Sequence, residues 1–192
     1  MCGIEGIWRL NNQSVDLEEL KRFTDSLLHR GPDGGGYELL DDNRLGLGQR
    51  RLSILDTSEL ASQPMFFADG RYAIVYNGEV YNFLELRKEL EGKGYSFRSG
   101  SDTEVILAAW AEWGKACLNR FNGMWAFAIW DRDKRELFLA RDRFGVKPLY
   151  YIHKPGQFFA FASESQAFRY IEGHKREFEL DHIAVALRDT LV

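Results

Sequence analysis

Short apolar runs, several of them alternating with polar residues, predict a chain rich in β-strands. The runs cover residues 2–8, 45–47, 52–55, 72–76, 124–130, 136–141, 149–153 and 158–162. The polar sequence 131–134 fits a hairpin turn between two of these runs, and Pro155-Gly156 fits another between the last two. Strands joined by such tight turns are antiparallel neighbours.

Three segments are instead predicted to be helices, the first from the 3.6-residue period of its apolar residues and the other two from their capping residues. In the first segment, Leu17, Leu20, Phe23 and Leu27 share one face. The signals that bound the helices are a capping-box pattern at Asp16 with a stop at Gly31-Pro32, a cap at Asn82 with Gly92, and a cap at Ser101 or Asp102 with Gly114. Helices inserted among antiparallel strands predict an α+β layered fold.

Composition narrows the class of protein. The chain has 192 residues, 45% hydrophobic and 28% charged, which is the balance of a globular domain with its own core. A net charge of -4 without a long basic run disfavours nucleic acid or an anionic membrane as a partner. The start lacks a signal-peptide pattern, and no apolar stretch reaches about 18 residues. We therefore expect a cytoplasmic protein.

The cysteines carry little metal-binding signal but supply one candidate nucleophile. Cys2 and Cys117 lie far apart and lack zinc-finger spacing, and the four histidines form no cluster. Two free thiols in a reducing compartment are expected. If Met1 is removed, Cys2 carries both a thiol and a free α-amine. These groups titrate close enough together for the amine to act as base for the thiol.

Four further polar clusters lie where the predicted elements begin or end. They span residues 29–33, 50–54, 77–82 and 100–104. Each alone has an ordinary structural explanation: a surface ion pair, a strand-end arginine, a turn dipeptide and a helix cap. Their occurrence together, after a cysteine at position 2, favours a functional site.

The clusters belong to longer strings in a recognisable order. These are Arg-Leu-Ser-Ile at 51–54, Asn-Gly-Glu-Val-Tyr-Asn at 77–82, Gly-Ser-Asp-Thr-Glu-Val-Ile at 100–106, Arg-Asp-Arg-Phe-Gly-Val-Lys-Pro-Leu-Tyr-Tyr at 141–151 and Phe-Ala-Ser-Glu at 161–164. From Cys2 to Ala167 the chain resembles the class II glutamine amidotransferases, and most of all the glutaminase domain of the asparagine synthetase family. The resemblance implies the Ntn-hydrolase (N-terminal nucleophile) fold, an αββα four-layer sandwich of two antiparallel sheets flanked by helices.

The resemblance also implies how glutamine is held. Arg51 would bind the α-carboxylate, because a guanidinium can bond both oxygens, and Asp102 would bind the α-ammonium. Glu79 and the backbone around Leu52 and Ile54 would help to fix the amino acid.

Three residues carry the implied chemistry. The Cys2 thiolate would attack the carboxamide carbon, and the Asn77 side chain with the Gly78 N–H would bind the oxyanion. The Cys2 amine would protonate the leaving ammonia, and water would release glutamate from the thioester. The resemblance implies no metal or organic cofactor for this reaction.

Two residues depart from the usual family pattern. Gln49 stands where a histidine is common, and it can form hydrogen bonds but cannot titrate. Glu5 stands where a small or apolar residue is usual. Strand alternation places Glu5 on the solvent face, with Cys2, Ile4 and Gly6 on the other.

The implied partner is a second domain. Residues 1–172 correspond to the glutaminase domain, and 173–192 to a linker and the first helix leading to an ATP-dependent synthetase domain. The Ser-Gly-Gly-x-Asp-Ser loop of that domain does not occur in this sequence, so ATP and Mg²⁺ are expected only there. We expect a truncated chain that passes ammonia to this domain, and a homodimer is left open.

Three alternatives stay open. Related proteins amidate other carboxylates, such as those on sugars or peptides, and the second domain chooses the acceptor. A non-catalytic docking module is disfavoured because Cys2, Arg51, Asn77, Gly78 and Asp102 are all present. A hydrolase of bulkier amides is disfavoured because the Arg51 and Asp102 pair suits a free amino acid.

Overall fold

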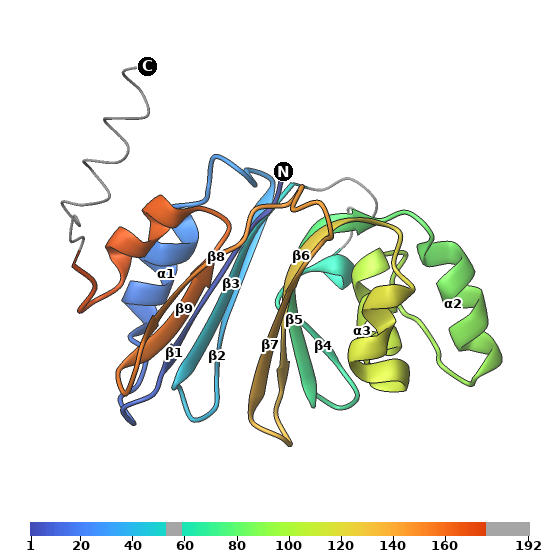
Figure 1. Cartoon of the computed structure of the whole chain (residues 1–192), viewed down its shortest axis with the longest axis horizontal. Coiled ribbons are helices and arrows are strands. Elements are labelled where there is room, and N and C mark those ends of the chain that lie inside the picture. The colour runs from blue at the N-terminus through green and yellow to red at the C-terminus, as the bar shows by residue number, and fades with distance from the viewer. Residues whose placement is uncertain (53–58, 176–192) are drawn as a thin grey trace, which may run out of the picture.

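The computed structural model describes residues 1–52 and 59–175, which form two antiparallel sheets packed face to face (Figure 1). The first sheet has the strand order β2-β3-β1-β9-β8 and the second β4-β5-β6-β7. The strands are β1 Gly3–Arg9, β2 Gly34–Leu40, β3 Leu45–Arg51, β4 Met65–Phe67, β5 Tyr72–Val80, β6 Gly123–Asp131, β7 Glu136–Arg141, β8 Tyr150–Lys154 and β9 Phe158–Ala162.

Helices cover the outer face of each sheet (Figure 1). Helix α1 (Leu17–Asp25) lies on the first sheet, and α3 (Asp102–Trp113) lies on the second with α2 (Phe83–Gly92) beside it. Three short 3₁₀ segments, η1 Glu59–Ala61, η2 Gly114–Asn119 and η3 Ser165–Tyr170, complete the described elements. The predicted αββα fold class is confirmed.

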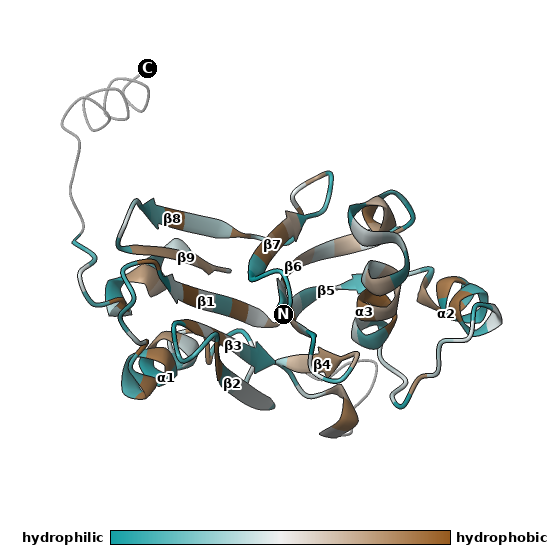
Figure 2. Cartoon of the chain, turned by 90° about the horizontal axis from the view of Figure 1, so that it is seen from below, coloured by the Kyte–Doolittle hydropathy of each residue, from teal (hydrophilic) through white to brown (hydrophobic). Residues whose placement is uncertain are grey.

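Each interface between layers has its own apolar core. The central core, between the two sheets, consists of Ile4, Leu45, Leu47, Ala73, Val75, Ala126, Ala128, Trp130 and Phe161. Figure 2 shows hydrophobic residues in the strands of both sheets and in α3, with hydrophilic residues in many connecting loops. Burial on both faces explains why the strands of both sheets read as apolar runs.

The predicted capping residues cap two of the three α-helices, α1 and α3. The Asp16 carboxylate accepts the Glu19 N–H at 2.9 Å, and the Ser101 hydroxyl accepts the Thr103 N–H at 3.2 Å. Ser101, and not Asp102, is therefore the cap of α3. The Asn82 side chain precedes α2 without capping it, because its oxygen accepts the Asn122 N–H instead.

The largest differences from the prediction concern strands. β7 and β9 have the predicted bounds, but β2 and β4 were not predicted. β2 begins with three glycines, which favour loops over strands. β3 runs to Arg51, and the expected strand at 52–55 falls mostly outside the described residues, as does the helix expected at 180–191.

The placement of Glu5 on a solvent face was wrong. Alternation holds, with Ile4 facing the other sheet, but the opposite face of β1 is covered by α1. Glu5 is 0% exposed, and its Oε1 accepts the Thr24 hydroxyl at 2.7 Å. Its Oε2 is buried and has no hydrogen-bond partner within the described part of the chain. Burial raises the pKa of Glu5 well above its usual value, which outweighs the lowering effect of the Thr24 bond. The surroundings of Glu5 therefore favour its protonated, neutral form.

The structure can also be searched for membrane-spanning helices, metal-ligand groups and disulfides. Within residues 1–52 and 59–175, no helix has the length and hydropathy needed to cross a bilayer. The same residues contain no group of three His, Cys, Asp or Glu side chains arranged to hold a metal ion. Cys2 and Cys117 are both free thiols.

Candidate active site

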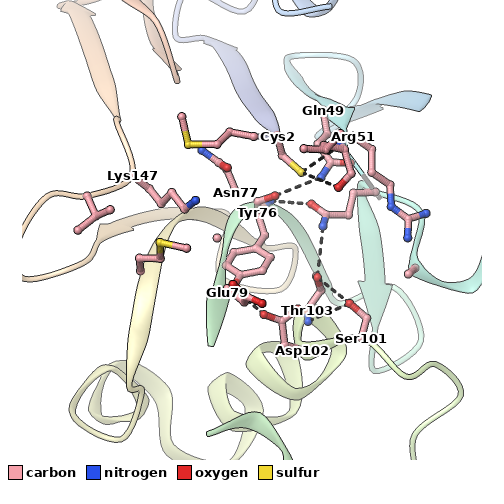
Figure 3. Close-up of a pocket in the computed structure, with 17 residues that line it drawn as sticks. Cys2, Gln49, Arg51, Tyr76, Asn77, Glu79, Ser101, Asp102, Thr103 and Lys147 are labelled. Atoms are coloured by element: carbon pink, nitrogen blue, oxygen red, sulfur yellow. Dashed lines mark hydrogen bonds between the residues drawn. The ribbon is translucent and has the colours of Figure 1, made fainter. Parts of the chain in front are cut away.

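A cavity of about 330 Å³ lies where the start of the chain meets the ends of β3 and β5 and the first turn of α3 (Figure 3). It is lined by Met1, Cys2, Gln49, Arg51, Leu52, Ala61, Gln63, Tyr76, Asn77, Gly78, Glu79, Ser101, Asp102, Thr103, Met124, Val146 and Lys147. Every site residue predicted from the sequence is in this lining except Ile54, which lies outside the described residues.

Cys2 immediately precedes β1 and is half-buried. Its Sγ lies 3.4 Å from the backbone nitrogen of Leu52, which donates to it, and 3.6 Å from the Leu52 carbonyl oxygen. The Leu52 backbone therefore both donates to the sulfur and accepts from it, which fixes the position of the Cys2 side chain. Leu52, whose backbone was predicted to help hold the amino acid, contacts the sulfur in this structure.

The backbone of Cys2 is held from the opposite side by a charged pair. Arg30 donates from Nε to the Cys2 carbonyl at 3.0 Å and from Nη1 to Glu164 at 2.9 Å. Burial opposes ionisation of Glu164, but hydrogen bonds from Gln166, His29 and Arg30 outweigh it and lower the pKa of Glu164 to about 2. The strings at 29–33 and 161–164 therefore position the thiol without lining the cavity.

Asn77 and Gly78 lie side by side on β5, opposite Ala126 and Trp125 of β6. Asn77 is 1% exposed, and its Nδ2 has no hydrogen-bond partner among the described residues. A Cβ at Gly78 would meet the Met124 carbonyl oxygen at 2.5 Å. The neighbouring strand β6 therefore leaves no room for a side chain at position 78. The sequence had suggested a different reason for this glycine, a close approach of the backbone to the substrate.

Asp102 lies in the first turn of α3, buried against β5. Its Oδ2 accepts the Tyr76 hydroxyl at 2.7 Å and the Val80 N–H at 2.9 Å. Burial raises the pKa of Asp102, and these two hydrogen bonds offset only part of that effect. A cationic ligand group would favour its charged form. Burial also raises the pKa of Tyr76 well above its usual value, so its hydroxyl stays a donor.

Two glutamines fix the main chain that carries Asn77. Gln49 donates from Nε2 to the Tyr76 carbonyl at 3.1 Å, and Gln63 accepts the Tyr76 N–H at 2.6 Å. Gln63 also donates to the Thr103 hydroxyl at 3.3 Å, which ties β5 to the start of α3. Gln49 thus keeps the hydrogen-bonding role expected of it, and its Oε1 is buried without a partner among the described residues.

The charged side chains surround Cys2 on different sides (Figure 3). Arg51, at the end of β3, extends its guanidinium away from Asn77, whereas Glu79 lies beside Asp102. Lys147, in the connection between β7 and β8, enters from the side of Asn77. A thiol, an unpaired amide donor and separated charges suit nucleophilic attack on a carbonyl group of a zwitterion.

Sequence reasoning missed Gln63, Tyr76 and Lys147 as cavity residues. Tyr76 directly precedes the Asn-Gly-Glu string, and Lys147 lies inside the quoted string at 141–151. Gln63 has no local signal, because its role depends on the approach of its loop to β5 and α3. Only the three-dimensional structure could have identified it.

The αββα fold and the residues of the cavity fit the class of glutamine amidotransferase domains. A solved structure, glutamine phosphoribosylpyrophosphate (PRPP) amidotransferase from Bacillus subtilis, superposes with a TM-score of 0.72 at 24% identity, covering 88% of this chain and 43% of that one. The profile of the glutamine amidotransferase domain family matches residues 1–191. The chain therefore belongs to the glutamine amidotransferase domain family.

Among the curated relatives that the chain resembles are two proteins named as asparagine synthetases and one named as an amidase. Asparagine synthetase [glutamine-hydrolyzing] 1 of Bacillus subtilis is 45% identical over 170 residues, which are 87% of this chain and 26% of that protein. Putative asparagine synthetase [glutamine-hydrolyzing] 2 of Methanocaldococcus jannaschii is 38% identical over 203 residues, 97% of this chain and 38% of the relative. Amidase chry2 of Gibberella zeae is 37% identical over 135 residues, 70% of this chain and 20% of the relative. The chain thus spans between a fifth and two fifths of these relatives.

Proposed function

We propose that this chain hydrolyses glutamine to glutamate and ammonia, with the N-terminal Cys2 as nucleophile after removal of Met1. The observation that supports this most is the meeting of the Cys2 thiol and the unpaired Asn77 amide donor in one cavity. Asn77 keeps a desolvated donor without a partner, which is unfavourable unless a ligand accepts from it.

Recognition of glutamine follows from the charges around the cavity. Asp102 and Glu79 bind the α-ammonium, and Arg51 binds the α-carboxylate after its guanidinium turns toward the ligand. Leu52 supports the ligand through its backbone, and Ile54 is assigned the same role from the family resemblance alone. A single apolar pocket would not select an amino acid, whereas opposite charges at fixed places do.

The reaction then proceeds in two balanced halves. The thiolate adds to the amide carbon, and the oxyanion accepts hydrogen bonds from the Asn77 side chain and the Gly78 N–H. The C–N bond breaks as the Cys2 α-ammonium protonates the leaving nitrogen, which gives ammonia and a thioester. Water adds to the thioester with the α-amine as base, and glutamate leaves as the thiol is restored.

The ammonia is passed to an ATP-dependent synthetase domain that makes asparagine. Support comes from relatives named asparagine synthetase that extend well beyond the matched region. The division at residue 172, with a linker and helix over 173–192, stays a prediction. A different carboxylate acceptor is the second candidate, because a relative named as an amidase shows that similar proteins are not all named asparagine synthetases.

The test combines intact mass with a glutaminase assay on purified protein. We expect loss of the Met1 mass and glutamine-dependent release of glutamate, which Cys2→Ala abolishes and Cys117→Ser leaves intact. Cys117 is a suitable control because it is fully buried outside the cavity. Processed protein that releases no glutamate would instead indicate a docking module, and retained Met1 would exclude the α-amine as base.

A further inference from the structure

Lys147 is a buried lysine that has no acidic partner among the residues the structure describes. Its exposed fraction is 6%, and no described carboxylate lies within ion-pair distance of its ammonium group. Its ammonium nitrogen is not among the fully buried polar atoms without a partner, so it is open to the cavity, where it keeps only part of its hydration. A charge held in this way without a counter-ion lowers the stability of the folded protein. The lysines that do form ion pairs among the described residues, Lys21, Lys93 and Lys115, have more exposed side chains.

The backbone around Lys147 is rigidly built. Asp142 accepts the Lys147 N–H at 3.0 Å and also the N–H groups of Phe144 and Val146. Arg141 donates from Nε to the Lys147 carbonyl at 2.6 Å. The lysine is therefore held at the cavity by a well-bonded loop and does not reach it by chance from a flexible segment.

The Lys147 ammonium group is directed into the end of the cavity where Asn77 lies, which we call the amide end. Figure 3 shows it pointing toward Asn77, on the opposite side of Cys2 from the Arg51 guanidinium. Among the other charged groups of the described lining, the Met1 α-ammonium belongs to the residue before Cys2. Glu79 and Asp102 lie at the other end with the titratable Tyr76.

The two ends of glutamine differ in charge. Its α-carbon carries fixed charges in the ground state, whereas its carboxamide is neutral until the thiolate attacks. A cation at the amide end therefore interacts little with bound glutamine and strongly with the thiolate and the oxyanion. Interactions that strengthen only in the transition state raise kcat and leave KM nearly unchanged.

We propose that Lys147 is a positioning residue of the glutaminase site, whose buried charge stabilises the Cys2 thiolate and the oxyanion held by Asn77. This inference rests on the proposed function. It assigns to a single buried charge both a stability penalty in the resting protein and a gain in turnover.

The test compares Lys147→Met and Lys147→Arg with Lys134→Met. Lys134 is exposed in the turn between β6 and β7, at the far end of β6 from the cavity, so its removal changes the net charge equally. We expect Lys147→Met to lower kcat by about tenfold to a hundredfold with KM changed less than about twofold. Lys147→Arg should recover most of the activity, and Lys134→Met should resemble the wild type.

Two further measurements separate this role from a structural one. The melting temperature of Lys147→Met should equal or exceed that of the wild type, since an unpaired buried charge is replaced by an apolar chain of similar length. The pH profile of Cys2 alkylation by iodoacetamide should shift upward by about 0.5–1 pH unit, because a neighbouring cation favours the thiolate.

The outcomes are distinguishable from failure of the proposed function. A rise in KM at unchanged kcat, a lower melting temperature, or an unshifted alkylation profile would overturn the role of Lys147 while glutaminase activity stands. If the wild type releases no glutamate, the proposed function fails. In that case a shifted alkylation profile still supports the effect of Lys147 on the thiol, and an unshifted one refutes it.

Discussion

Replacing Glu5 by methionine is expected to stabilise the protein, increasingly so as the pH rises. Glu5 is fully buried on β1, with one oxygen bonded to Thr24 and the other unpaired. An unsatisfied buried polar atom costs about 1–3 kcal/mol, and a neutral hydrogen bond contributes about 0.5–1.5 kcal/mol. The Thr24 hydroxyl keeps an alternative acceptor, the Leu20 carbonyl at 2.9 Å. The net gain at pH 5 is therefore about 1 kcal/mol, or roughly 2–4 °C in a domain of this size.

The pH dependence follows from the raised pKa of Glu5. The folded protein keeps a proton on Glu5 at pH values where the unfolded chain has already lost it, so folding becomes less favourable as pH rises above the usual glutamate range. Methionine and glutamine both remove this titration. The difference in melting temperature between Glu5→Met and wild type should thus be larger at pH 8 than at pH 5.

Thermal unfolding at both pH values is the assay, and Glu5→Gln is the matched control, since it keeps an acceptor for Thr24 but cannot ionise. A difference between variant and wild type that is independent of pH would show that folding does not raise the pKa of Glu5. A loss of stability in Glu5→Met at pH 8 would refute the reasoning altogether.

Three further predictions concern the site and its support. Asn77→Ala should lower kcat by about 10²–10³ with little change in KM, measured by glutamate release, because the oxyanion loses one donor; a rise in KM alone would contradict this role. Arg51→Ala should mainly raise KM for glutamine, and titration of glutamine binding to the inactive Cys2→Ala protein checks it. Glu164→Gln should lower stability at neutral pH, and urea midpoints should converge with those of the wild type as pH falls from about 4.5 toward the folded pKa of about 2. The stabilisation is present above the unfolded pKa and is lost on protonation, so a constant difference across this range would argue against the pair with Arg30.

Local patterns were sufficient for elements whose residues fit one template. β9 reads as a continuous apolar run and β7 as a short apolar segment after a polar turn, and both have the predicted bounds. β2 was missed because Gly34, Gly35 and Gly36 carry no strand preference, and the strand exists through its pairing with β3. Tertiary pairing, which a local pattern does not contain, decided that segment.

The error at Glu5 has a similar cause. Alternation correctly separates the two faces of β1, but it does not say whether the second face meets water or another layer. In a four-layer fold both faces are covered, and a charged residue there must be neutralised or paired. Arg9 on the same face shows the second solution, with its guanidinium bonded to Glu19 at 2.7 Å.

The residues that line the cavity were easier to find from the sequence than the residues that support it. Asn77, Gly78, Arg51 and Asp102 stand in strings whose order identifies the family, and the structure places them on one cavity. The residues that support the cavity lack such strings. Gln63 acts through two contacts with distant segments, so its place depends on the folded chain alone.

The first strand of this chain, β1, lies in the interior of the fold. β1 is the third of five strands in its sheet, and Arg30 grips the carbonyl of Cys2. Chain ends usually fray, and they are the customary place for an affinity tag. Here a tag fused ahead of Met1 would lie across the mouth of the cavity and keep the α-nitrogen acylated. Material for enzymology should therefore carry its purification handle at the carboxyl end.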